Sequence, residues 1–170
     1  MKHLLIVFFC FGSLVSTAQD PEANLAKLGI KLPTPQKPVA NYVNIVQTGK
    51  LLYLSGKGPT REDGSNITGK LGKDLTIDEG YAAARLVAIN HLAVLKDYLG
   101  DLSKVKRVIK VLGMVNCESS FTDQPKVING YSDFMVAIFG EKGKHARSAV
   151  GFNALPSNIA VEVEVIVEIE

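Results

Sequence analysis

Two stretches of the chain repeat apolar residues at the spacing of an amphipathic helix, and the first follows Thr76-Ile77-Asp78-Glu79. A threonine with a glutamate three residues later is typical of a capping box at a helix N-terminus. Gly100 is a helix-ending residue, so we predict a helix that runs from Thr76 to Leu99. Its apolar positions form two adjoining rows and predict one wide buried face: Ala82, Leu86, Ile89 and Ala93, beside Ala88, Leu92, Leu95 and Leu99.

The second stretch begins after Thr122 or Asp123, either of which is a good N-cap. Pro125 falls in the first turn, where a missing N–H is tolerated, and Gly140 marks the end. The predicted buried face consists of Val127, Ile128, Tyr131, Phe134, Met135 and Ile138.

The C-terminal residues alternate between apolar and acidic side chains, which predicts a strand with one buried face. The apolar face carries Val161, Val163, Val165, Val167 and Ile169, and the other carries Glu162, Glu164, Glu168 and Glu170. Further strands are predicted at 43–46 and 51–55, joined as a hairpin, at 105–115 and at 145–152, with one short strand near 67–70 inside a glycine-rich loop.

The order of these elements predicts an α+β fold: an antiparallel-rich sheet with two helices on one face. Because both helices then cover the same side, the other face of the sheet meets water or a partner.

The N-terminal residues differ from the rest of the chain. Residues 1–18 carry Lys2, an apolar run and the small residues Ser16 and Ala18, which is the pattern of a secretory signal peptide cleaved near Ala18/Gln19. The alternatives are an uncleaved anchor or a buried first helix. Residues 19–37 are expected to form a proline-rich arm with one helical turn, and residues 38–170 the folded domain. The mature protein is therefore expected to be exported, periplasmic or secreted.

Charge and cysteine content exclude several function classes. Removing residues 1–18 takes away Lys2, the only Lys, Arg, Asp or Glu there, and lowers the formal net charge from +2 to +1. A near-neutral chain is not expected to bind nucleic acid or, after signal removal, a membrane. Cys117 is then the single cysteine, so no internal disulfide is expected. We expect no metal site, since His91, read as a helix-face residue, and His145, read as exposed, have no second ligand at useful spacing.

The segment His145-Ala-Arg-Ser-Ala-Val-Gly151 places an arginine among small residues. Strand alternation groups Arg147 with His145 and Ala149, and puts the apolar residues on the opposite side, which predicts that Arg147 faces away from the helices. A guanidinium in that setting suits a carboxylate ligand. An ordinary cross-strand ion pair with Glu162 or Glu164 explains the pattern equally well.

The segment RSAVGFNALPSNIAVEVE, Arg147 to Glu164, resembles the C-terminal signature of the RidA/YjgF family, formerly called the endoribonuclease L-PSP family. Three other stretches resemble the same family: Tyr42 followed by the hairpin that ends in Ser55-Gly56, the helix at 80–99 with its following turn, and Asn129. The resemblance covers about residues 38–170. The N-terminal arm and longer loops resemble a larger-loop, exported subgroup.

The resemblance implies a chorismate-mutase-like fold and a homotrimer, in which three sheets pack into a barrel-like assembly with a cleft at each interface. It implies hydrolysis of amino-acid-derived enamines and imines, such as 2-aminoacrylate, to 2-keto acids and ammonia, as by a 2-iminobutanoate/2-iminopropanoate deaminase. Neither a cofactor nor a metal is implied.

The resemblance also implies residue roles. Arg147 would hold the substrate carboxylate, and Glu162 would activate water or pass a proton. Ser55, Gly56 and Asn129 would line the cleft, and Tyr42 would cover it from a neighbouring subunit.

Two positions depart from the pattern of the family. Ala149 stands where many members have cysteine, which changes the shape of the substrate pocket. Lys57 stands where a polar or amide residue is common.

Two other functions compete with the deaminase. The first is a non-catalytic trimeric protein that binds a small carboxylate in the same cleft, which export and the altered pocket favour. The second is a ribonuclease, against which the low net charge argues.

Overall fold

The computed structural model describes residues 20–38 and 40–170, so the expected signal segment lies outside the described residues. Its helices are α1 (Pro21–Lys27), α2 (Ile77–Leu99) and α3 (Gln124–Phe139), and its strands are β1 (Ile45–Thr48), β2 (Leu51–Lys57), β3 (Val105–Asn116), β4 (Ala146–Phe152) and β5 (Val161–Ile169).

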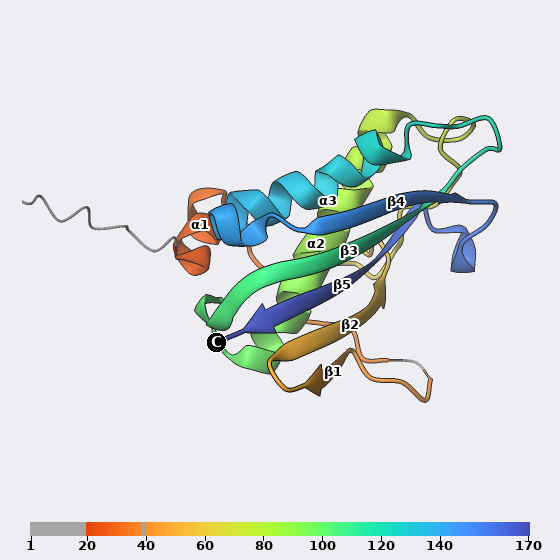
Figure 1. Ribbon diagram of the computed structural model, residues 1–170. Helices are drawn as coiled ribbons and strands as arrows, with labels where there is room; N and C mark the ends of the chain where they lie inside the picture. The colour runs from red at the N-terminus through yellow and green to blue at the C-terminus, as the bar shows by residue number, and fades with distance from the viewer. Residues whose placement is uncertain (1–19, 39) are drawn as a thin grey trace, which may run out of the picture.

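The five strands form one mixed sheet in the order β1-β2-β5-β3-β4. Only the β3–β4 pair is parallel. Helices α2 and α3 lie on the same face, and none of the described helices covers the other face, which we call the uncovered face (Figure 1). This architecture confirms the predicted α+β fold with an antiparallel-rich sheet and two helices on one face.

The ends of α2 agree with the prediction. Thr76 and Glu79 form both bonds of the capping box, and Gly100 ends the helix at a φ of 75°, a conformation that favours glycine. The predicted face of α3 is also confirmed, since all six of its apolar side chains are buried.

One predicted row of α2 is wrong. Ala82 is exposed and Leu86 and Ile89 are only half-buried, whereas Ala84 and Val87 are fully buried. The reason is that α2 packs against two neighbours, the sheet and α3, so its buried face is centred on the contacts between them and not on that row. The backbones of α2 and α3 approach so closely that a Cβ added at Gly130 would collide with the carbonyl of Tyr81.

The strand predicted near residues 67–70 is absent. The segment between β2 and α2 forms only isolated bridges, such as Thr68 with Ile159. Gly64 and Gly69 have positive φ values of 83° and 122°, which interrupt any extended run.

The N-terminal arm begins with α1, as expected, and polar contacts connect α1 to α2 and α3. Glu22 forms an ion pair of 2.6 Å with Lys96 of α2, and Asn24 donates a hydrogen bond of 2.8 Å to the carbonyl of Ile138 in α3. In the part of the chain that the structure describes, none of the helices has the length and apolar character needed to cross a membrane.

Candidate functional site

Arg147 lies on β4, at one edge of the sheet, and its side chain is directed to α3. Its Nη1 donates hydrogen bonds to Oδ1 of Asn129 at 2.9 Å and to Oγ of Ser132 at 3.0 Å. The prediction that Arg147 faces away from the helices is therefore wrong. The apolar residues Val150 and Phe152 are the ones on the uncovered face, where they are 38% and 42% exposed. Among the described residues, Nε and Nη2 of Arg147 have no partner, so they can donate to a ligand.

His145 contacts Ser132, the serine that also binds Arg147. The side chain of His145 is half-buried, not exposed as expected. Its Nδ1 lies 2.7 Å from the carbonyl oxygen of Gly143 and must donate to it, because a carbonyl only accepts. In the neutral imidazole, Nε2 then accepts from Ser132 at 3.0 Å. Burial, and secondarily the charge of Arg147, lower the pKa of His145. Ser132 is thus held with its oxygen available to the guanidinium.

Glu162 lies on β5, on the uncovered face of the sheet. Its carboxylate covers the backbone of Gly56, where an added Cβ would collide with Oε1 of Glu162. The pairing register of β2 shifts between Leu54 and Lys57, so Gly56 lies at an irregularity of the strand. Burial raises the pKa of Glu162, and the nearby charge of Glu164 raises it further. A carboxyl group with a raised pKa is suited to acid–base work near neutral pH.

Ser55 is held by a buried histidine. Nε2 of His91 donates to the carbonyl oxygen of Ser55 at 3.3 Å, and its Nδ1 accepts from the hydroxyl of Tyr131 at 3.0 Å. Burial lowers the pKa of His91 to about 4, so the ring is neutral at pH 7. The interpretation of His91 as an ordinary helix-face residue is wrong, because the side chain is fully buried.

Arg147 and Glu162 do not meet within one chain. Strand β3 lies between β4 and β5. Val111 of β3 pairs with Arg147 on one side and with Val165 on the other. Val165 is three residues along β5 from Glu162. Two strand spacings and three residues along the strand each correspond to roughly 10 Å. The two side chains also leave opposite faces of the sheet. The cross-strand pair with Glu162 or Glu164 that the sequence allowed is therefore excluded.

The uncovered face has a hollow of about 310 Å³ whose lining includes Val46, Tyr53, Ser55, Lys110 and Glu164. Several of its apolar side chains are exposed, among them Val46 at 58% and Tyr53 at 43%. Tyr42, in the segment that leads into β1, is 48% exposed and has no hydrogen bond from its hydroxyl to any described residue.

The remaining predicted site residues lie in two places. Ser55 and Gly56 lie beside Glu162, whereas Asn129 contacts Arg147 directly. Ala149 is half-buried on the same side of β4 as Arg147 and packs against the core. The described residues hold no group of three or more His, Cys, Asp or Glu side chains that could bind a metal ion.

Sequence reasoning missed Ser132 and Tyr131 as parts of this arrangement. One signal for His91 was present: it lies three residues after Ala88 and four before Leu95, in the middle of an apolar helix face. A polar side chain at such a position is buried and requires a partner.

The fold and these residues define an α+β protein with one uncovered sheet face, an anchored arginine at the sheet edge and a half-buried glutamate over a glycine. Residues 22–169 match the family described as "YjgF/chorismate_mutase-like, putative endoribonuclease". The chain therefore belongs to the YjgF/chorismate-mutase-like family, which confirms the RidA/YjgF resemblance.

Three known proteins are similar to this chain over most of its length. The chain is 48% identical to Protein TCP17 of Trypanosoma cruzi over 86% of its own length and 92% of the relative. It is 30% identical to a 2-iminobutanoate/2-iminopropanoate deaminase of Dermatophagoides farinae over 83% and 95% of the two chains. The crystal structure of Atu1372 from Agrobacterium tumefaciens, a protein of unknown function, is 44% identical with a TM-score of 0.82, over 88% and 92% of the chains.

Proposed function

We propose that this protein hydrolyses amino-acid-derived enamines and imines to 2-keto acids and ammonia, without a cofactor. The observation that carries the proposal is the state of Arg147: Asn129 and Ser132 hold the guanidinium, while Nε and Nη2 have no partner among residues 20–38 and 40–170. This arrangement suits a planar carboxylate, which every such substrate carries. The family and the deaminase of Dermatophagoides farinae support the same reaction class.

In the proposed reaction, Arg147 binds the substrate carboxylate and orients the adjacent C=N bond. The enamine first takes up a proton at carbon and becomes an iminium ion. Glu162 then positions a water molecule, which adds to the iminium carbon and passes a proton to the nitrogen. The C–N bond then breaks as the new hydroxyl group loses its proton to form the carbonyl; ammonia leaves and takes up this proton, so the products are a 2-keto acid and an ammonium ion. The reaction requires positioning and one acid–base group, which together supply large rate effects.

The proposed site is completed by a second copy of the chain. Arg147 and Glu162 leave opposite faces of one sheet, so a single chain cannot present both to a small substrate. A trimer in which the uncovered face of one protomer meets the β4 edge of its neighbour would bring them together. The exposed Val46, Tyr53 and Phe152 on the uncovered face support such packing. In this arrangement Tyr42 covers the cleft from the adjacent protomer.

A non-catalytic binding protein is the second candidate, and the separation of the two residues favours it. Arg147 is anchored for a carboxylate within one chain, independently of Glu162. Binding therefore needs only the β4 edge, whereas turnover needs both parts. In this case the ligand is a small carboxylate that is released unchanged.

The deciding experiment generates 2-aminoacrylate in situ and follows keto-acid release in the presence of the full chain. We expect Arg147→Ala and Glu162→Gln to lose most of the rate. Arg107→Ala serves as the matched control, because Arg107 is exposed on β3 and pairs with Glu168, away from the site. If the wild-type rate equals that of buffer, the deaminase is rejected. Arg147-dependent binding of pyruvate by calorimetry would then favour the binding protein.

We further propose that the chain is exported and cleaved near Ala18/Gln19. The proposal rests on the charge and hydropathy pattern of residues 1–18. N-terminal sequencing of the protein from fractionated cells tests it, and an intact Met1 in the cytoplasmic fraction would contradict it.

A further inference from the structure

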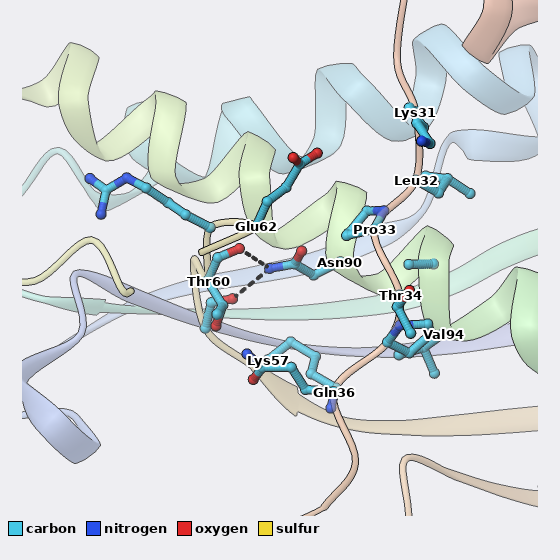
Figure 2. A pocket seen from close by; sticks show the side chains of 14 residues that line it. Lys31, Leu32, Pro33, Thr34, Gln36, Lys57, Thr60, Glu62, Asn90 and Val94 are labelled. Atoms are coloured by element: carbon cyan, nitrogen blue, oxygen red, sulfur yellow. Dashed lines mark hydrogen bonds between the residues drawn. The ribbon is translucent and has the colours of Figure 1, made fainter. Parts of the chain in front are cut away.

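A second cavity, of about 370 Å³, lies between the N-terminal arm and α2 (Figure 2). We call it the arm groove; its walls come from residues 31–36, the segment 57–62 and residues 90, 93 and 94 of α2. Its volume is in the range of small-molecule pockets. Lys57 pairs directly with the buried Val163, so its side chain projects from the face of the sheet that the helices cover. The arm groove is therefore on the opposite side of the sheet from Glu162.

Lys57 is the polar centre of the arm groove. Its ammonium donates a hydrogen bond of 2.6 Å to Oδ1 of Asn44, whose amide donates to the carbonyl of Gln36 in the arm at 3.1 Å. Within residues 20–38 and 40–170, no carboxylate lies within ion-pair distance of Lys57. Burial lowers the pKa of this half-buried amine. A partly desolvated cation without a counter-charge favours an anionic ligand, which would compensate it.

The other charged residues of the arm groove do not compensate Lys57. Arg61 is engaged by its own loop, since Nη1 donates to Oγ of Ser65 and to the carbonyl of Asn66, both at 3.2 Å. Glu62 is exposed, and Figure 2 shows its carboxylate directed away from Lys57. Lys31 is exposed at the rim and adds positive charge.

The remaining walls combine apolar and uncharged polar side chains. Leu32 and Pro33 from the arm and Val94 of α2 supply apolar side chains to the lining (Figure 2). Asn90 donates through Nδ2 to the carbonyls of Gly58 and Thr60, at 3.2 and 3.0 Å, and thereby holds the segment after β2 in place. Apolar side chains in the same groove as the unpaired ammonium of Lys57 match a ligand with an anionic group and a small apolar body.

We propose that the arm groove binds a small monocarboxylate with a short branched apolar body, separately from the Arg147 site. The carboxylate pairs with the ammonium of Lys57, and the body packs between Leu32, Pro33 and Val94. The proposal does not depend on the deaminase activity, because it concerns other residues: the arm groove lies at β2, and two strands separate β2 from Arg147 on β4.

The test titrates 3-methylbutanoate into the full chain, with methyl labelling for NMR. We expect contacts from the ligand methyl groups to Leu32 and Val94, and binding detectable at about 10 mM or below, as for a weak ligand with a dissociation constant near 1 mM. The neutral isostere 3-methylbutanamide should bind at least about tenfold more weakly, since that factor corresponds to the loss of one charge-assisted contact. Inorganic phosphate, which has no apolar body, should leave the methyl resonances of Leu32 and Val94 unshifted.

Variants separate the two sites. Lys57→Met should abolish the contacts at Leu32 and Val94, whereas Arg147→Ala should leave them unchanged. Lys50→Met is the matched control, because Lys50 is exposed in the β1–β2 turn and its loss should have no effect. The proposal is overturned if the wild-type chain shows no contacts at these methyl groups, if the amide binds as well as the acid, or if Lys57→Met retains binding. The wild-type contacts decide the question even if Lys57→Met does not fold.

Discussion

The hydroxyl of Tyr131 donates a hydrogen bond of 3.0 Å to Nδ1 of His91, and both side chains are fully buried. This bond connects α3 to α2 and leaves Nε2 of His91 to donate to the carbonyl of Ser55. The two helices therefore hold the end of β2 from beneath the sheet, immediately before Gly56 and the carboxylate that covers it.

The first prediction concerns that bond. Tyr131→Phe removes the donor and leaves Nδ1 of His91 buried without a partner, which should lower the free energy of unfolding by about 1–3 kcal/mol. Urea denaturation measures the change. Tyr53→Phe is the control, because the Tyr53 side chain is 43% exposed and its change should be within about 0.5 kcal/mol of wild type. An equal effect of both substitutions would show that the buried bond is unimportant.

The second prediction concerns pH. The pKa of His91 is lowered from 6.5 to about 4 in the folded protein, so the unfolded chain takes up a proton first as the pH falls. The stabilisation is present above pH 6.5 and is lost between about pH 6.5 and pH 4, by up to about 3 kcal/mol.

Comparison with His91→Gln isolates this contribution from the carboxylates, which titrate in both proteins. The free energy of unfolding of the wild type should fall more steeply than that of the variant between about pH 7 and pH 4.5. Parallel pH profiles would mean that His91 is not held neutral in the folded state.

The third prediction concerns Gly56 and Glu162. A Cβ at Gly56 would collide with the Glu162 carboxylate, so Gly56→Ala should destabilise the fold by about 1–3 kcal/mol. In a Glu162→Ala background the carboxylate is absent, and Gly56→Ala should lower the free energy of unfolding by much less. A double-mutant cycle measured by urea denaturation gives the coupling, which should reach about 1 kcal/mol or more. If the effects of the two substitutions are additive, the Glu162 carboxylate does not contact Gly56 in solution.

The fourth prediction concerns His145. Its pKa is lowered first by burial and then by the charge of Arg147, so Arg147→Ala should raise the pKa towards the ordinary value. NMR titration of the imidazole measures the shift. Arg107→Ala removes an exposed arginine that is paired with Glu168 and should leave the His145 titration unchanged. If Arg147→Ala has no effect either, the link from Arg147 through Ser132 to His145 is not maintained in solution.

The sequence by itself determined the two long helices, the strands of the sheet and the family, although not the absence of a strand near residues 67–70. The capping box at Thr76 and the stop at Gly100 are local signals, because the residues that form each lie within a few positions of one another. The alternation of β5 is equally local, and its valines are buried as expected. The segment from Arg147 to Glu164 identified the family for the same reason: its pattern is contained in one stretch of chain.

Only the tertiary structure decided how these elements face one another. Alternation sorts the residues of β4 into two sets but does not say which set meets the helices, and the small residues around Arg147 give either side little hydrophobic preference. The placement of β3 between β4 and β5 separated Arg147 from Glu162. Tyr131 became the partner of His91 across 40 positions of sequence. These outcomes depend on long-range packing, in which each side chain is positioned by neighbours that are remote along the chain.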